Sequence, residues 1–212
     1  MSQLSAIGVS RTYQRGSEII RAVDDVTLHL EPGVVTVLQG PSGSGKTTLL
    51  NLLAGWERPD AGHIEWEGTD RDPSGLGWTD LSVVPQRVGL LSELSAIENV
   101  TLAARVRHEA TDLDGLFARF GLEELEHAFP DELSAGQQQR VAITRALADR
   151  PAVVLVDEPT SSQDEENAHL VLGEFRRLAS EGGTCLIASH DPIALDYANR
   201  VIRMRDGRLE GD

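Results

Sequence analysis

One segment fits the phosphate-loop pattern G-x-x-x-x-G-K-[ST], namely Gly40-Pro41-Ser42-Gly43-Ser44-Gly45-Lys46-Thr47. The apolar residues 34–38 before it are typical of a short buried strand, and residues 47–54 after it are typical of a helix that ends at Gly55. Glycines let backbone N–H groups point inward, and the start of the helix adds partial positive charge toward a bound anion. A turn that merely joins a strand to a helix would not require the complete pattern. We therefore expect a nucleotide-phosphate site.

Lys46 is the only lysine among the 19 basic residues of the chain. A lysine ammonium is a compact charge, whereas an arginine guanidinium is a wide planar fork. A loop that folds tightly around two phosphates has room for the first and not for the second. We therefore assign Lys46 to the phosphates and the hydroxyl of Thr47 to Mg²⁺.

Length and composition favour one globular domain, because 212 residues are enough for one well-packed core. No stretch reaches the roughly 18 consecutive apolar residues of a membrane span, and no basic-then-apolar leader begins the chain. We therefore expect a cytosolic protein. Cys185 is the only cysteine, which excludes a disulfide and a cysteine metal site, and its apolar neighbours predict a buried strand position.

The net charge of −15, from 34 acidic and 19 basic residues, argues against two kinds of partner. Proteins that bind nucleic acids gain much of their affinity from basic side chains that neutralise phosphates. Anionic lipid headgroups would repel an acidic surface in the same way. We therefore expect no nucleic acid and no direct lipid anchor, so any membrane association must go through a protein partner.

The order of the expected elements indicates an α/β fold. Strand-rich residues 4–38 lead into the phosphate loop, helical periodicity dominates residues 92–148, and strand–helix alternation then returns. Such alternation favours a mostly parallel sheet with helices on both faces. The expected strands are residues 4–13, 22–30, 34–38, 64–68, 82–86, 153–156 and 185–189, with a terminal hairpin at Asp206-Gly207; the expected helices are residues 47–54 and 165–181, one after a capping box of Ser95 and Glu98, one containing Leu113 to Phe120, and one from Asp191-Pro192.

Two adjacent carboxylates, Asp157 and Glu158, follow the apolar residues 153–156. A carboxylate buried without a partner costs several kcal/mol, so a pair at the end of a buried strand indicates a cation or a catalytic role. Successive strand residues point to opposite sides, so the two acids should have different roles. We assign Asp157 to the Mg²⁺ shell and Glu158 to the attacking water as its general base. The alternative is a helix cap or a surface turn.

Residues 133–140, Leu-Ser-Ala-Gly-Gln-Gln-Gln-Arg, resemble the signature sequence of ATP-binding cassette (ABC) ATPases. In that family Tyr13 corresponds to an aromatic residue that stacks on adenine, and Gln86 to a glutamine that contacts Mg²⁺ or water. His190 corresponds to the switch histidine that contacts the γ-phosphate, and Asp164 to a loop aspartate that crosses the dimer interface. Each match is weak alone, but their order along the chain supports all of them together.

The resemblance implies a P-loop NTPase ABC-ATPase fold, with a mostly parallel sheet core, an antiparallel β subdomain and an inserted α-helical lobe. Residues 1–212 would form a single domain, with the core at about residues 1–88 and 149–212 and the lobe at about residues 89–148. The implied site residues are Lys46, Gln86, Glu158 and His190 for catalysis; Thr47, Gln86 and Asp157 for Mg²⁺; and Tyr13, Gly40, Pro41, Ser42, Gly43, Ser44, Gly45, Lys46, Thr47, Thr48, Ser134, Gly136, Gln137 and Asp164 for ATP.

The signature residues also have a physical sense of their own. Ser134 and Gly136 precede a helix that contains Val141, Ile143 and Leu147, so they lie at a positive helix end suited to an anion. In the family this end faces the γ-phosphate held by a second subunit. The resemblance therefore implies that two such chains, identical or similar, pair head to tail around two ATP molecules.

Two positions depart from the family pattern. Ala135 stands where glycine is commoner and adds one methyl group near the phosphates, which the flanking Gly136 should accommodate. Gln163 stands where leucine is usual, and it replaces an apolar contact at the expected dimer interface with a polar one. Gln163 should therefore bear on the affinity of the dimer or on the coupling between its sites, while hydrolysis should survive.

Family membership implies the ATPase half of a membrane machine, with an integral membrane permease as a separate subunit. Within residues 86–100, Val88, Leu90, Leu91 and Leu94 are apolar, and they either form a docking groove for the partner's coupling helix or belong to the core of the lobe. The chain looks most similar to the lipoprotein-release and macrolide-export group of the family. This likeness rests on the phosphate loop, on residues 51–55 and 97–100, and on the short C-terminus. The expected location is the inner face of the cell membrane, reached through the permease.

Two other functions compete with transport. A soluble ABC ATPase of DNA repair or translation usually carries tandem cassettes, zinc-binding inserts, coiled coils or basic arms, which this acidic chain lacks. A non-enzymatic nucleotide switch that gates a membrane-associated partner would bind ATP without steady turnover. A GTPase is excluded because the chain contains no Asn-Lys-x-Asp motif.

Overall fold

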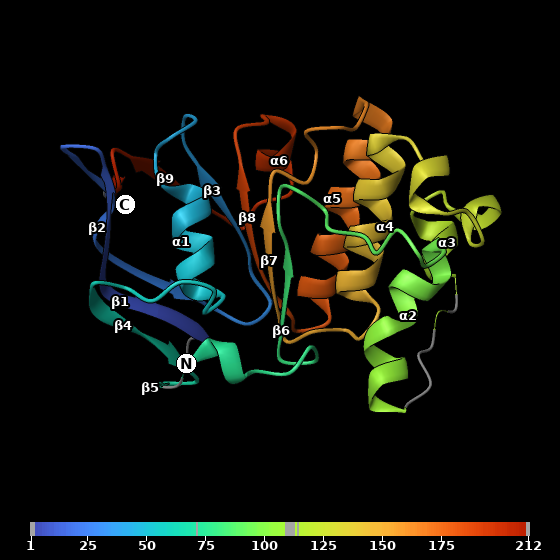
Figure 1. Cartoon of the computed structure of the whole chain (residues 1–212), viewed down its shortest axis with the longest axis horizontal. Coiled ribbons are helices and arrows are strands. Elements are labelled where there is room, and N and C mark those ends of the chain that lie inside the picture. Colours follow the sequence, from blue (N-terminus) through green and yellow to red (C-terminus); the bar gives the residue numbers. More distant parts are fainter. Residues whose placement is uncertain (1–2, 71, 109–112, 114, 211–212) are drawn as a thin grey trace.

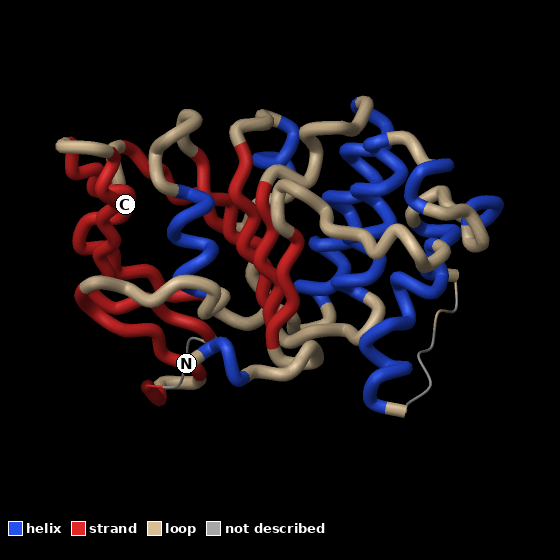
Figure 2. Tube along the Cα trace, viewed as in Figure 1, coloured by secondary structure: helices blue, strands red, loops and turns tan. Residues whose placement is uncertain are grey.

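The computed structural model describes residues 3–70, 72–108, 113 and 115–210, so the outermost residues of the expected 1–212 domain, 1–2 and 211–212, lie outside the described part. Two sheets and a group of helices make up the molecule, with the strands on one side of the view and most helices on the other (Figures 1 and 2). The strands are β1 (Leu4–Arg15), β2 (Glu18–Leu30), β3 (Val35–Gln39), β4 (Ala61–Trp66), β5 (Thr69–Asp70), β6 (Leu81–Val84), β7 (Val153–Asp157), β8 (Thr184–Ser189), β9 (Arg200–Arg205) and β10 (Arg208–Glu210). The α-helices are α1 (Lys46–Leu53), α2 (Ala96–Arg107), α3 (Leu116–Arg119), α4 (Ala135–Leu147), α5 (Glu165–Ser180) and α6 (Ile193–Asp196), and short 3-10 turns cover Pro73–Gly75, Glu123–Leu125 and Pro130–Glu132.

The larger sheet has six strands in the order β10-β9-β3-β8-β7-β6. Its strands are parallel except for the terminal β9–β10 hairpin, which the Asp206-Gly207 turn predicts. The second sheet is antiparallel, in the order β2-β1-β4-β5. The predicted fold class is therefore confirmed: a mostly parallel core accompanied by an antiparallel subdomain and a helical part.

The parallel sheet separates two hydrophobic cores, which explains why β7 is apolar at consecutive positions. Val154 and Val156 pack into the core shared with α2, α4 and α5. Val153 and Leu155 pack on the opposite face with α1 and the antiparallel sheet. A strand covered on both faces needs no polar alternation. The sheet is thus fixed from both sides, and its carboxyl edge carries the site.

Two helices begin at capping boxes, which set where their polar ends lie. The Ser95 hydroxyl accepts from the backbone N–H of Glu98, and the Glu98 carboxylate accepts from the backbone N–H of Ser95, as the sequence predicts. Ser134 and Gln137 form the same arrangement at the start of α4. The start of the signature helix is therefore fixed by its own side chains.

Some expected boundaries were wrong. β1 and β2 extend to Arg15 and from Glu18, so they form a longer hairpin than the apolar pattern indicates. β6 ends at Val84, so Gln86 lies in the following loop. α3 is a single turn of four residues that does not include Leu113. Cys185, as expected, is fully buried in β8.

Among the described helices, none combines the length and apolar character required to cross a bilayer. The lobe boundary at about residues 89–148 stays a prediction, because α2 and α4 share one continuous core with α5 and the central sheet.

Candidate active site

The phosphate loop lies between β3 and α1 and is packed too closely for side chains at two of its glycines. A Cβ on Gly45, whose φ is +106°, would lie 2.1 Å from the carbonyl oxygen of Ala22. A Cβ on Gly40 would lie 2.3 Å from the carbonyl oxygen of Met204. The loop is therefore held from behind by β2 and β9, and glycine is required for this close approach as well as for backbone freedom.

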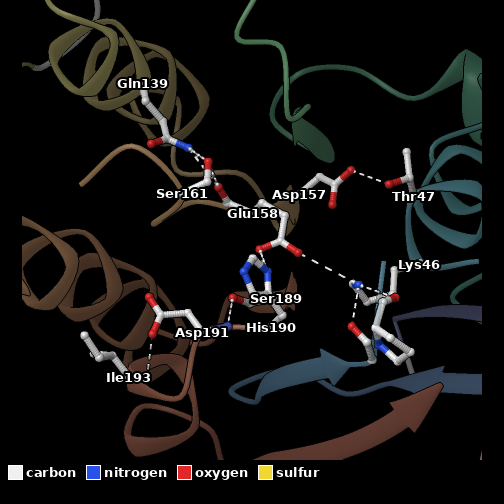
Figure 3. A network of polar contacts seen from close by, with 12 residues as sticks. Lys46, Thr47, Gln139, Asp157, Glu158, Ser161, Ser189, His190, Asp191 and Ile193 are labelled. Carbon is white, nitrogen blue, oxygen red and sulfur yellow. Dashed lines mark hydrogen bonds and ion pairs between the residues drawn. The ribbon is translucent and has the colours of Figure 1, made fainter. Parts of the chain in front are cut away.

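Lys46 is buried at the first position of α1, and its ammonium points back into the loop. Its Nζ donates to the carbonyl oxygens of Gly40 at 2.7 Å and Pro41 at 3.2 Å. The same Nζ lies 3.8 Å from Oε1 of Glu158 (Figure 3). The only lysine of the chain thus places its charge between the loop and the end of β7.

Asp157 ends β7 and meets the first turn of α1. Thr47 donates its hydroxyl to Oδ2 of Asp157 at 2.7 Å (Figure 3). Burial raises the pKa of Asp157, and the negative charge of Glu158 adds to this, whereas the Thr47 bond and Lys46 oppose it. A buried carboxylate beside a hydroxyl is short of positive charge, and these oxygen ligands suit Mg²⁺.

Glu158 faces His190 across the end of the sheet. Oε2 of Glu158 lies 2.9 Å from Nδ1 of His190, and Oε1 faces Lys46 (Figure 3). The backbone of Glu158 has a φ of +52°, which is unusual for a residue with a side chain. Bonds from its N–H to Ala188 and from Gln139 to its carbonyl hold this conformation. Such strain in an over-determined setting is typical of functional sites.

A cavity of about 540 Å³ opens over the phosphate loop. Tyr13 and Gln86 line it from β1 and from the loop after β6, as the sequence predicts. Arg11 covers one side of the Tyr13 ring at 5.2 Å, and the Tyr13 hydroxyl donates to Glu57. The predicted residues that line this cavity are Tyr13, Ser42, Gly43, Gly45, Lys46, Thr47, Thr48, Gln86, Asp157 and Glu158.

The other expected site residues lie elsewhere. Gly40, Pro41 and His190 line a neighbouring hollow of about 430 Å³, together with Arg203 and Arg205. The signature residues Ser134, Gly136 and Gln137, and the loop aspartate Asp164, line neither cavity. Within one chain, the signature and the phosphate loop are therefore not brought together.

Sequence reasoning missed the residues that complete the cavity wall. Ile20, Arg21 and Ala22 reach it from β2, and Asp206 reaches it from the β9–β10 turn. The available signal in the sequence was the pair Ile19-Ile20 between the charged residues Glu18 and Arg21. In the structure these two side chains are 71% and 38% exposed. No local pattern could place the β9–β10 turn beside a loop about 160 positions earlier.

The donor set fits a magnesium–nucleotide complex better than a metal held by protein alone. No group of three or more His, Cys, Asp or Glu side chains within the described ranges gathers as a metal site. Mg²⁺ typically takes one or two protein ligands and fills its shell with water and phosphate oxygens. Ser44 also has a buried hydroxyl with no partner inside the described structure, and it lies within the phosphate loop.

A family model described as ABC transporter matches residues 23–161, which include the phosphate loop, the signature and both carboxylates. The chain belongs to the ABC transporter family. The resemblance inferred from residues 133–140 is thereby confirmed, and the chain is an ABC ATPase.

Similar ABC proteins cover nearly the whole chain. The uncharacterized ABC transporter ATP-binding protein Rv0986 of Mycobacterium tuberculosis (strain ATCC 25618 / H37Rv) is 37% identical over 95% of this chain and 86% of its own length. The macrolide export ATP-binding/permease protein MacB 1/2 of Paracoccus denitrificans (strain Pd 1222) is 38% identical over 97% of this chain but only 32% of its own length. The predicted likeness to the macrolide-export group is therefore confirmed, and this chain spans about a third of such proteins.

The ABC fold is also confirmed by solved structures. The dimeric, post-hydrolysis ATP-binding cassette MJ0796 bound to ADP and Pi superimposes with a TM-score of 0.88 at 30% identity, covering 98% of this chain and 97% of that chain. That cassette is a dimer with products bound.

Proposed function

We propose that two copies of this ABC ATPase pair head to tail, hydrolyse ATP with Mg²⁺, and drive a separate membrane permease of export or mechanical-transmission type. One observation carries the pairing. The phosphate loop, Glu158 and His190 lie together at the carboxyl edge of the sheet, whereas Ser134 and Gly136 line neither the cavity over the loop nor the neighbouring hollow. The site is incomplete until a second chain supplies a signature helix. The dimeric cassette MJ0796, at 30% identity, supports this pairing.

The described side chains divide the work of hydrolysis. The backbone of the phosphate loop and Lys46 bind the phosphates, and Tyr13 offers the ring side away from Arg11 to adenine. Thr47 and Asp157, which bond to each other at the end of β7, would hold Mg²⁺, and the ion would supply positive charge to neutralise the developing charge on the phosphates. Glu158 takes a proton from water as general base, and His190, bonded to its Oε2, orients that carboxylate. The contact of His190 with the γ-phosphate stays an expectation from the family resemblance, because His190 lines the neighbouring hollow. Gln86 lines the same cavity, where it would contact Mg²⁺ or water.

The test is a Glu158→Gln variant, which keeps the shape of the side chain and removes the base. We expect it to bind ATP, to form a stable dimer on size-exclusion chromatography, and to lose at least about a hundredfold in turnover. Glu123→Gln removes the same charge from an exposed position and should behave like the parent. A variant that stays monomeric with saturating ATP, alone and beside its membrane partner, would refute the pairing. Binding without turnover in the parent protein would instead indicate a nucleotide switch.

We place the permease contact at a groove of about 410 Å³ that is lined by residues 54–56 and 73–78 and by β6, α2 and α4. Two tryptophans on its wall remain exposed, Trp56 at 55% and Trp78 at 46%, which suits an apolar helix face as occupant. Arg145, on the same wall, donates to the carbonyl oxygens of Val88 and Gly89, and so connects the groove to the segment after Gln86. The residues predicted for docking, Val88, Leu90, Leu91 and Leu94, do not line this groove, and Leu90 packs against the helical core instead.

This contact would hold the ATPase at the inner face of the cell membrane. We expect Trp56→Ala and Trp78→Ala to retain ATP hydrolysis by the isolated protein and to lose co-purification with the permease. Val106→Ala removes an exposed apolar side chain from α2 outside the groove and is the control. Undiminished co-purification of the tryptophan variants would place the contact elsewhere.

A further inference from the structure

Gln163, the residue that departs from the family pattern, forms a polar junction within its own subunit. Its Nε2 donates to the carbonyl oxygen of Gly136 at 3.0 Å and to Oε1 of Gln139 at 2.9 Å. Its Oε1 accepts from Nη1 of Arg140 at 2.9 Å. All three partners lie in the first two turns of α4. The sequence predicts a polar contact of Gln163 at the dimer interface, and the structure shows that its amide is also bonded inside its own chain.

The loop that carries Gln163 also packs directly on the start of α4. A Cβ on Gly136 would lie 2.6 Å from the carbonyl oxygen of Ser162, so no gap separates the two segments. The junction reaches the catalytic carboxylate through one more residue. Gln139 donates from Nε2 to the carbonyl oxygen of Glu158 at 2.8 Å, and the Ser161 hydroxyl donates to the same oxygen at 3.1 Å (Figure 3).

A leucine at position 163 would break this network at buried positions. Gln139 is 3% exposed and Arg140 is 8% exposed. The Nε of Arg140 already lacks a hydrogen-bond partner in the part of the chain that is described, and burial lowers the pKa of the guanidinium. Removing the Gln163 amide would leave further buried polar atoms without partners, which is more costly than the bonds themselves are stabilising.

We propose that Gln163 is a positioning residue that couples the two ATP sites of the dimer from within one subunit. This proposal rests on the head-to-tail pairing proposed above, in which the start of α4 faces the ATP held by the partner, while Glu158 acts on the ATP held by its own chain. Gln163 bonds to the start of α4, and Gln139 connects this part of α4 to the backbone carbonyl of Glu158. A movement of α4 when the partner's ATP arrives is thus transmitted to Glu158.

The test compares Gln163→Leu with the parent in ATPase assays over a range of ATP concentrations. Because Gln163 does not line the ATP cavity, the KM for ATP should stay within about twofold. The kcat should fall about tenfold, as expected when one to two hydrogen bonds that orient a catalytic group are lost. The Hill coefficient should fall toward the value of independent sites, a change that a purely structural defect would not produce.

Gln138→Leu is the matched control. Gln138 also lies on α4 and donates two hydrogen bonds, to the carbonyl oxygens of Pro130 and Leu133, without touching the loop of Gln163. It should lower thermal stability as much as Gln163→Leu does and leave the Hill coefficient unchanged. Gln139→Met combined with Gln163→Leu should lower kcat by less than the product of the single effects, because both substitutions cut one network.

Two failures are distinguishable. A Glu158→Gln variant that never dimerises with ATP would overturn the pairing itself. If that variant dimerises and the parent hydrolyses ATP cooperatively, an unchanged kcat and Hill coefficient in Gln163→Leu would overturn the role of Gln163 alone.

Discussion

One glycine behind the phosphate loop, Gly207, supports the backbone of that loop. Gly207, in the β9–β10 turn, donates its N–H to the carbonyl oxygen of Ser44 at 3.0 Å. Its φ is +80°, and a Cβ there would lie 2.9 Å from the carbonyl oxygen of Arg21. The turn therefore supports the loop at a position that tolerates no side chain.

Gly207→Ala should weaken ATP binding about tenfold, because a strained backbone costs about 1–3 kcal/mol and the turn would relax by moving away from the loop. Titration with a fluorescent ATP analogue measures the change. Gly173→Ala is the control, since Gly173 lies inside α5 with open space around it, and this substitution should stabilise the fold by about 1 kcal/mol. Equal ATP affinity in both variants would show that the turn does not support the loop.

Between elements, two carboxylates in the loop before β4, Glu57 and Asp60, fasten the hairpin that carries Tyr13. Asp60 accepts from the N–H and the hydroxyl of Thr12, each at 2.7 Å, and from Arg11 at 2.8 Å. The Thr12 bonds, followed by Arg11, hold the pKa of Asp60 below its ordinary value of 3.8. A lowered pKa in the folded state means that this carboxylate stabilises the fold above the ordinary value and loses that effect as the pH falls below it.

Asp60→Asn should therefore destabilise the protein at neutral pH, and the difference from the parent should shrink as the pH falls through the ordinary aspartate pKa. Urea unfolding over this pH range measures the difference. Asp70→Asn, which removes an equal charge from exposed β5 of the same sheet, controls for the change in net charge. A pH-independent difference would mean that the Asp60 charge is not involved.

Cys185 offers a probe of the central sheet. It is fully buried in β8, and burial raises its pKa to about 12. A thiol reagent at mildly alkaline pH should therefore not label the folded protein and should label it completely in denaturant. In mild denaturant, where transient opening allows slow labelling, saturating ATP should slow it, because a ligand that binds only the folded state lowers the open population. Rapid labelling without denaturant would contradict the burial.

The local pattern predicted most elements and failed where distant segments meet. Residues 153–156 predict a strand buried on both faces because every one is apolar, and the family resemblance implies that Glu158 and His190 belong to one catalytic site. The contacts of Gln163 with Gly136 and Gln139 were not predictable, because they depend on how a loop packs on a helix 27 and 24 positions earlier. Asp206 enters the cavity wall for the same reason.

Across the whole molecule, the sheet that supports the site is built from both ends of the sequence. β3 lies between β8 and β9, so the strand that leads into the phosphate loop pairs with residues 184–189 and 200–205. A chain that stops after residue 199 would lack one neighbour of β3 and the Gly207 bond to Ser44. We expect such a truncation to abolish ATP binding and to reduce helical content on circular dichroism. A truncated chain that retains ATP affinity would contradict this account.

The pairing of β3 with β8 and β9 has a consequence during translation. Contacts between residues so far apart in the sequence form slowly, because the intervening chain must first be closed into a loop. While the ribosome is still adding α5, the phosphate loop has already been made, but neither neighbour of β3 has. We therefore expect a nascent chain to bind no nucleotide until residues 200–207, which pair with β3 and support the phosphate loop, have been made.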